Sequence, residues 1–118
     1  MGTINSAFVL GNLGSDPDFT LTPNGHAVCE LSIATRRTQM QNEQRTTDTV
    51  WHKVKLWRHN AEFARDHLSK GDPVAIEGSI RHEVWTSTNG AKHRRSIILG
   101  HRLTLLGKSR ERIESELT

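Results

Sequence analysis

Cysteine is almost absent from this sequence of 118 residues, and tyrosine is absent altogether. Because Cys29 is the single cysteine, no disulfide can form within the chain, which excludes the small secreted domains that depend on disulfides. Long apolar runs are missing too: no window approaches the ~20 apolar residues of a membrane span, and the first residues lack the pattern of a secretory signal. We therefore expect a cytoplasmic protein, in a reducing compartment, without a membrane partner.

The residue patterns that carry catalysis or bind cofactors are missing as well. The seven histidines are scattered without the spacing of metal ligands, and one cysteine cannot complete a zinc site. No glycine-rich loop opens a helix to hold a phosphate, and no residue lies in a nucleophile elbow. We expect no catalytic residue, no metal and no cofactor, so an enzyme acting on nucleic acid is an alternative without a candidate site.

Positive charge is unevenly distributed along the chain. Residues 1–35 contain no Lys or Arg, whereas residues 36–110 carry a net charge of +8, which the acidic ends reduce to +3 overall. Clustered Lys and Arg are typical of a protein that binds a polyanion such as nucleic acid. A solvated surface that keeps the protein in solution explains the same charge, so charge alone leaves both interpretations open.

Alternation of apolar and polar residues predicts a single all-β domain. Turn signals at residues 23–25 (PNG) and 89–90 (NG) separate the alternating segments. The predicted strands are residues 4–13, 26–36, 49–57, 73–85 and 92–106. One helix between the third and fourth strands completes the order of the OB-fold, a partly open five-stranded Greek-key barrel. Residues 37–48 are polar without periodicity and are interpreted as a long, mobile connection.

Residues 60–70 have the end signals of that helix. Asn60 is a suitable N-cap, and Gly71 can adopt the left-handed conformation that ends a helix. The predicted inward face consists of Phe63, Ala64, His67 and Leu68.

The third predicted strand places large aromatic residues beside cations. Its period-two geometry directs Trp51, Lys53, Lys55 and Trp57 to one face. The opposite, core-forming face consists of Val50, His52, Val54 and Leu56. In the fourth strand Trp85 lies on the face opposite the aliphatic residues. Tryptophan is normally mostly buried, so three tryptophans on outer faces indicate a surface that binds a ligand.

Single-stranded nucleic acid fits this arrangement, because it exposes flat bases and phosphates together. A site that ignores sequence needs aromatic platforms for the bases and mobile cations for the phosphates. The expected platforms are Trp51, Trp57 and Trp85, and the alternative for any one of them is that it packs at a subunit interface. The expected phosphate contacts are Lys53, Lys55, Arg36, Arg37, Arg58, Arg81, Arg94 and Arg95.

Six ordered motifs and Trp85 resemble the bacterial single-stranded DNA-binding protein family over residues 5–106. The motifs are residues 11–17 (GNLGSDP), 23–25 (PNG), 33–35 (IAT), 51–56 (WHKVKL), 68–71 (LSKG) and 76–81 (IEGSIR). The resemblance implies an OB-fold that assembles as a homotetramer and binds single-stranded DNA with little sequence preference. It also implies that Trp51, Trp57 and Trp85 stack on bases and that His52 lies near a subunit interface. Residues 1–107 would form this domain, followed by a short charged tail of residues 108–118.

The sequence also departs from the family pattern. Gln39 stands where an aromatic residue is usual, and Ser6 stands where a basic residue is common. The family's Gly/Pro/Gln linker and acidic, hydrophobic-ended tip have no counterpart in residues 108–118, so docking of repair enzymes through that tip is not expected. The expected role is protection of single-stranded DNA during replication, recombination and repair, with replication or recombination proteins as further partners. The alternative is an OB-fold primosomal replication accessory protein that acts mainly by protein contacts.

Overall fold

Strands make up most of the structure. The computed structural model describes residues 2–108 and shows six strands and one helix in this range. The elements are β1 (Ala7–Leu13), β2 (Asp18–Leu21), β3 (Ala27–Gln41), β4 (Gln44–Trp57), α1 (His59–His67), β5 (Pro73–Thr86) and β6 (Lys92–Leu105). The expected charged tail lies, apart from Lys108, outside the described residues.

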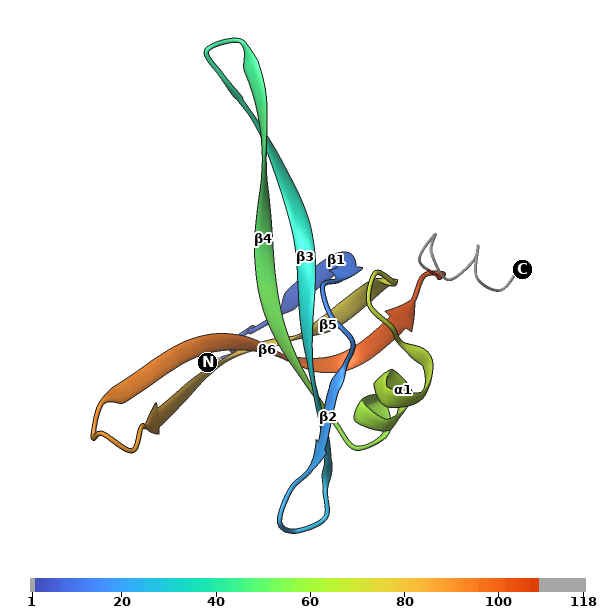
Figure 1. Cartoon of the computed structure of the whole chain (residues 1–118), viewed down its shortest axis with the longest axis vertical. Coiled ribbons are helices and arrows are strands. Elements are labelled where there is room, and N and C mark those ends of the chain that lie inside the picture. Colours follow the sequence, from blue (N-terminus) through green and yellow to red (C-terminus); the bar gives the residue numbers. More distant parts are fainter. Residues whose placement is uncertain (1, 109–118) are drawn as a thin grey trace.

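Five of these strands close into a barrel. They are hydrogen-bonded in the order β1-β5-β6-β4-β3, and β1 returns to β3 through pairs such as Leu13↔Ile33. Neighbouring strands are antiparallel except β4 and β6, which run parallel at Val54↔Ile98. The closed five-stranded barrel, with α1 between its third and fourth strands, confirms the predicted OB-fold (Figure 1).

β2 is a short strand that the sequence pattern did not indicate. It pairs antiparallel with the first part of β3 and forms a hairpin with it. Its four residues alternate polar and apolar side chains, but the segment is too short, between Pro17 and Pro23, for the alternation to stand out. Pro17 immediately before it signals a turn instead, because proline cannot donate a ladder hydrogen bond.

The barrel interior is filled by side chains from every strand of the barrel. Its largest fully buried aliphatic residues are Leu31, Ile33, Val54, Leu56, Val74 and Ile76. Cys29 lies among them, and burial raises the pKa of its thiol to about 11. A thiol that stays protonated in the core has a packing role.

Helix α1 packs against the barrel through small residues. Ala61 and Ala64 are fully buried, and Leu68 continues this face just beyond the helix. Phe63 and His67, which the sequence placed inward, are exposed and contact each other at a ring-centroid distance of 4.7 Å. The prediction was wrong for these two because the face of α1 that packs on the barrel is formed by Ala61, Ala64 and the following Leu68, and Phe63 and His67 lie outside it.

The start of α1 also differs from the prediction. Arg58 occupies the N-cap position with a φ of 57°, and its side chain makes no cap hydrogen bond. Asn60 therefore lies inside the first turn, where its amide donates to the His101 carbonyl oxygen at 3.2 Å. Gly71 has a positive φ of 92°, but it lies in the turn before β5 rather than at the helix end.

Residues 37–48, interpreted from sequence as a mobile connection, form a two-stranded ribbon. β3 and β4 stay paired from the barrel out to Gln41↔Gln44, and Asn42 and Glu43 make the turn with positive φ angles. Figure 1 shows this β3–β4 arm, residues 36–49, extending away from the barrel. Both of its faces are exposed, so no apolar alternation exists to reveal the strands.

A second ribbon is formed by the ends of β5 and β6. This β5–β6 arm, residues 82–96, turns at Gly90, which has the positive φ that the Asn-Gly signal predicted. Ile80 and Val84 share a face with the buried Val74 and Ile76 but are exposed, because β5 is buried only as far as Gly78. The two arms and the barrel between them carry the predicted site residues.

Candidate nucleic-acid interface

The outer face of the β3–β4 ribbon presents two tryptophans and two lysines. Val54 and Leu56 point into the core, so Trp51, Lys53, Lys55 and Trp57 point outward, as predicted. The exposed fraction is 60% for Trp51 and 38% for Trp57. Both indoles therefore have surface available for a planar ligand.

The Trp51 indole packs against the turn that follows β1. A Cβ on Gly14 would overlap the six-membered ring of the Trp51 indole, so the ring lies directly against the glycine backbone. In the sequence Gly14 stands out only as part of the motif at residues 11–17. In the structure its missing side chain makes room for the indole.

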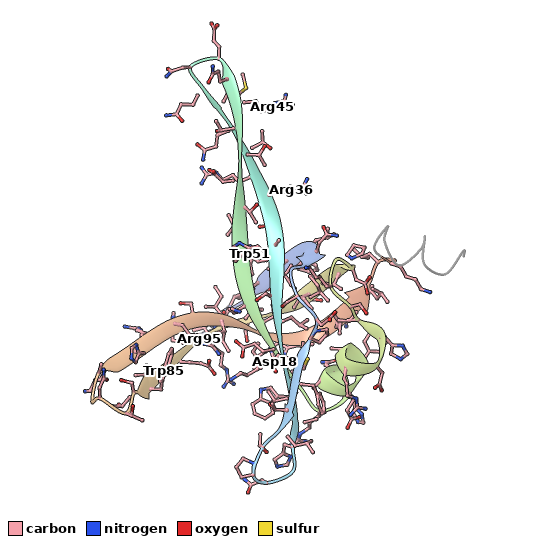
Figure 2. All side chains as sticks on the ribbon, in the orientation of Figure 1. Asp18, Arg36, Arg45, Trp51, Trp85 and Arg95 are labelled. Atoms are coloured by element: carbon pink, nitrogen blue, oxygen red, sulfur yellow. The ribbon has the colours of Figure 1, made fainter. Side chains whose placement is uncertain are left out.

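Trp57 lies in a hollow of about 240 Å³ between β2, β3 and β4. Asp18 and Thr20 of β2 form one wall, while Glu30 and Lys55 lie beside the indole. Sequence reasoning missed these β2 residues because it did not predict the strand. Figure 2 shows Asp18 at the junction of this hairpin with the barrel.

Trp85 lies on the β5–β6 arm with an exposed fraction of 46%. Its ring stacks on the cross-strand His93 at a centroid distance of 5.3 Å and an interplanar angle of 21°. The Arg95 guanidinium carbon lies 5.9 Å from the Trp85 ring centroid. These contacts orient the indole, which borders a hollow of about 440 Å³.

Two of the predicted phosphate-binding cations are held by carboxylates. Lys55 Nζ lies 2.6 Å from Glu83 Oε2, and Arg95 contacts both Glu83 and Glu30 at 2.7 Å. The Lys55 ammonium, followed by Arg95, holds the pKa of the Glu83 carboxyl below its usual range, and hydrogen bonds to Glu30 and Glu83 raise the pKa of Arg95. We name this group of four side chains the ion-pair network.

The other predicted cations have no carboxylate within 4.0 Å among residues 2–108. Lys53 donates to the Ser32 hydroxyl at 2.7 Å, and no ion pair involves Arg36, Arg37, Arg58, Arg81 or Arg94 in the described chain. These side chains keep their charge available for an anion.

The two arms place neighbouring arginines on opposite faces. Arg36 is on the same face of the β3–β4 arm as Trp51, because the pairs Arg36↔Thr49 and Ala34↔Trp51 are two residues apart. Arg37 faces the other way. Similarly, Arg95 shares a face with Trp85 and Arg94 does not.

Arg45 is a cation of this surface that the sequence did not single out. It pairs with Met40 near the tip of the β3–β4 arm, on the same face as Arg36 and Trp51. Figure 2 shows Arg45, Arg36 and Trp51 in succession along the ribbon. Arg45 was not identified from the sequence because residues 37–48 were interpreted as a loop, and a residue in a loop cannot be assigned to a strand face.

His52 is half-buried, with Nε2 2.9 Å from the Thr35 hydroxyl oxygen. It borders a hollow of about 450 Å³ whose lining includes Phe8, Trp51 and Ile80. Within residues 2–108, no three His, Cys, Asp or Glu side chains are close enough to hold a metal ion. In the same range, no helix has the length and apolar character needed to cross a membrane.

A closed five-stranded barrel with one helix defines an OB-fold protein, and its outer faces carry partly exposed tryptophans beside cations. The profile of the single-strand binding protein family matches residues 4–106. The chain belongs to this family, as its motifs indicated.

Individual proteins support the assignment. Two single-stranded DNA-binding proteins of Neisseria meningitidis, from serogroups A and B, are each 34% identical over 110 residues, which cover 92% of this chain. The chain spans 63% of the length of these relatives. The solved structure of the Plasmodium falciparum SSB complex with single-stranded DNA has a TM-score of 0.82 at 22% identity, covering 91% of this chain and 98% of that one. The last comparison confirms the fold.

Proposed function

We propose that this protein binds single-stranded DNA with little sequence preference. The observation that carries the proposal is the set of three partly exposed tryptophans on outer faces of an OB-fold that also carries cations without a carboxylate partner among the described residues. Family membership and the names of the relatives point in the same direction. The function expected from sequence and the function that the surface suits best therefore agree.

Stacking explains why such a site tolerates any sequence. Every base has a flat face, and stacking on an aromatic side chain contributes about 1–3 kcal/mol per base by alanine substitution. The phosphates would contact unpaired cations: Arg36, Arg45, Lys53 and Arg81 on the faces that carry the tryptophans, Arg58 at the start of α1, and Arg37 and Arg94 on the opposite faces of the two arms. Each neutralised charge would contribute a slope of about −0.7 to the dependence of log K on log salt.

A fluorescence titration tests the proposal. Addition of oligo-dT should quench the fluorescence of the exposed tryptophans and saturate at a defined number of nucleotides per chain, because stacked indoles lose emission. A duplex of the same length should bind more weakly, since its bases are already stacked on each other. Absence of quenching at micromolar protein, or equal affinity for duplex and single strand, would contradict base stacking.

Protection of single strands during replication, recombination and repair is the cellular role that we assign to this binding. The alternative, an accessory protein that acts mainly through protein contacts, is less well supported, because it would not need three exposed tryptophans. We propose that this protein acts by binding rather than by catalysis, in line with its family membership. We place the protein on DNA of the nucleoid, with replication or recombination proteins as further partners.

A homo-oligomer, and specifically a homotetramer, is part of the proposal. β1 exposes two large apolar residues on the outside of the barrel: the exposed fraction is 70% for Phe8 and 64% for Leu10. Phe8 also borders the hollow beside His52, the residue that family resemblance places near a subunit interface. A second copy of this chain would cover this apolar face.

Substitution of Phe8 by Asp should dissociate the oligomer. Burial of one such side chain contributes about 1.5–3 kcal/mol, and a symmetric interface buries it twice, so the association constant should fall by at least roughly 100-fold. Light scattering would report the change as a lower molar mass. Val84→Asp, an equally exposed apolar site on the β5–β6 arm, is the control that should keep the mass. A wild-type protein that is already monomeric would overturn this part of the proposal.

A further inference from the structure

The ion-pair network lies between two tryptophans of the proposed interface. Glu30 and Lys55 border the hollow that holds Trp57, and Glu83 and Arg95 border the hollow of Trp85. The four side chains come from β3, β4, β5 and β6 and carry two positive and two negative charges. The surface between the two hollows is therefore electrically neutral, although it contains two of the predicted phosphate contacts.

The contacts within the network are short and partly shielded from water. Lys55 has a side-chain exposure of 21%, and its ammonium lies 2.6 Å from Glu83. Arg95 uses Nε and Nη2 on Glu83 and Nη1 on Glu30, at 2.7–2.8 Å. Charge-assisted hydrogen bonds of this length are among the stronger polar contacts in proteins, and partial burial reduces their screening by salt.

Lys53 provides a contrast on the same face of the same strand. Its ammonium donates to a neutral hydroxyl, and it has no carboxylate partner among the described residues. A phosphate that approaches Lys53 meets a free cation. A phosphate that approaches Lys55 must displace a carboxylate of similar charge and then remain beside it.

We propose that Glu83 keeps Lys55 from contacting the phosphates of bound DNA. Between Trp57 and Trp85 the DNA strand then contacts the protein through its bases, while its phosphates contact the unpaired cations elsewhere on the surface. The inference rests on the proposed single-strand binding. In this view Glu83 determines both affinity and salt dependence. It keeps the centre of the interface neutral and limits the number of counterions that binding releases.

The substitution Glu83→Gln tests the inference, because glutamine keeps the size of the side chain and an acceptor oxygen but removes the charge. Freed Lys55 should bind a phosphate, while Arg95 keeps its contact with Glu30. We expect oligo-dT affinity to rise by about threefold to tenfold and the salt slope to steepen by about 0.7. Anisotropy of a labelled oligo-dT at several salt concentrations measures both quantities.

Two further variants separate the release of Lys55 from a general gain of charge. Asp66→Asn removes a carboxylate that pairs with Arg65 on α1, outside the interface, and should leave the slope unchanged. Glu83→Gln combined with Lys55→Gln should return the slope to the wild-type value. A slope that stays steep in the double variant would contradict the role of Lys55.

Two outcomes overturn the inference even where wild-type protein binds DNA. The first is weaker binding of Glu83→Gln at an unchanged salt slope, which would mean that Glu83 only holds the β5–β6 arm in position. The second outcome applies if Glu83→Gln does not fold, in which case two single substitutions in the wild-type protein are compared. Lys53→Gln should make the salt slope shallower by about 0.7, and Lys55→Gln should change it by less than half as much. Equal changes in the two variants refute the inference. Wild-type protein that does not bind oligo-dT refutes the proposed function instead.

Discussion

A variant in which Trp57 and Trp85 are both replaced by Ala is expected to lose most of its affinity for single-stranded DNA. Each indole lies in its own hollow and is large enough to stack on a base. Two losses of about 1–3 kcal/mol each correspond to an affinity lower by a factor on the order of 30 to 10⁴. Coupling between the two sites makes the losses less than additive and places the factor at about 30. Anisotropy of a labelled oligo-dT measures the change, since tryptophan fluorescence is altered by the substitutions themselves.

The control for this variant is Phe63→Ala, which truncates an exposed aromatic residue on α1, away from the two arms. It should bind oligo-dT like the wild type. The double tryptophan variant should also keep its β-sheet circular dichroism, because neither indole is buried in the core. Unfolding of that variant would show that the tryptophans stabilise the barrel, and full retention of affinity would refute stacking at these positions.

Leu56→Ala, one residue away from Trp57, should have the opposite consequence. Leu56 is fully buried, and a Cβ on Gly100 would lie only 2.5 Å from its Cδ2 atom, so the site is closely packed. Truncation leaves a cavity and should lower the free energy of unfolding by about 2–5 kcal/mol. That is a large share of the roughly 5–15 kcal/mol that stabilises a domain, and denaturant unfolding would measure it.

The matched substitution Leu21→Ala removes the same atoms from an exposed position on β2 and should change stability by less than about 0.5 kcal/mol. Oligo-dT affinity of the folded fraction of Leu56→Ala should stay near the wild-type value, because Leu56 points away from the proposed interface. A stable Leu56→Ala variant with impaired DNA binding would mean that the face assignment of β4 is wrong.

The barrel could be predicted because each of its strands has one solvent-exposed face and one buried face. Val54 and Leu56 alternate with Lys53 and Lys55, and this period-two signal is present wherever a strand lines the core. Both faces of the β3–β4 arm are exposed to solvent, so Arg45 and its neighbours show no alternation of apolar and polar residues. They were therefore interpreted as a mobile connection. β2 was missed for a different reason: its four residues between Pro17 and Pro23 are too few to reveal a period.

The candidate site was predictable residue by residue but not in its contacts. The residue type and strand parity of Trp51, Trp57 and Trp85 were enough to propose stacking. The partners of Lys55 and Arg95 were not foreseen, because Glu83 is 28 residues from Lys55 and Glu30 is 65 residues from Arg95. In the sheet, β6 separates the strands of Lys55 and Glu83, and β4 separates those of Arg95 and Glu30, so these side chains meet only through the register of the closed barrel.

The scarcities of the sequence thus had definite consequences. One cysteine and no long apolar run exclude a disulfide-dependent domain and a membrane span. The sequence by itself also determined an all-β domain with three outward tryptophans, because side-chain direction in a strand alternates with sequence position. Only the tertiary structure decided which charges meet. Barrel closure and the path of the two arms bring Glu30 and Glu83 to Lys55 and Arg95, and Coulomb attraction at such short distances turns two expected phosphate contacts into a neutral network.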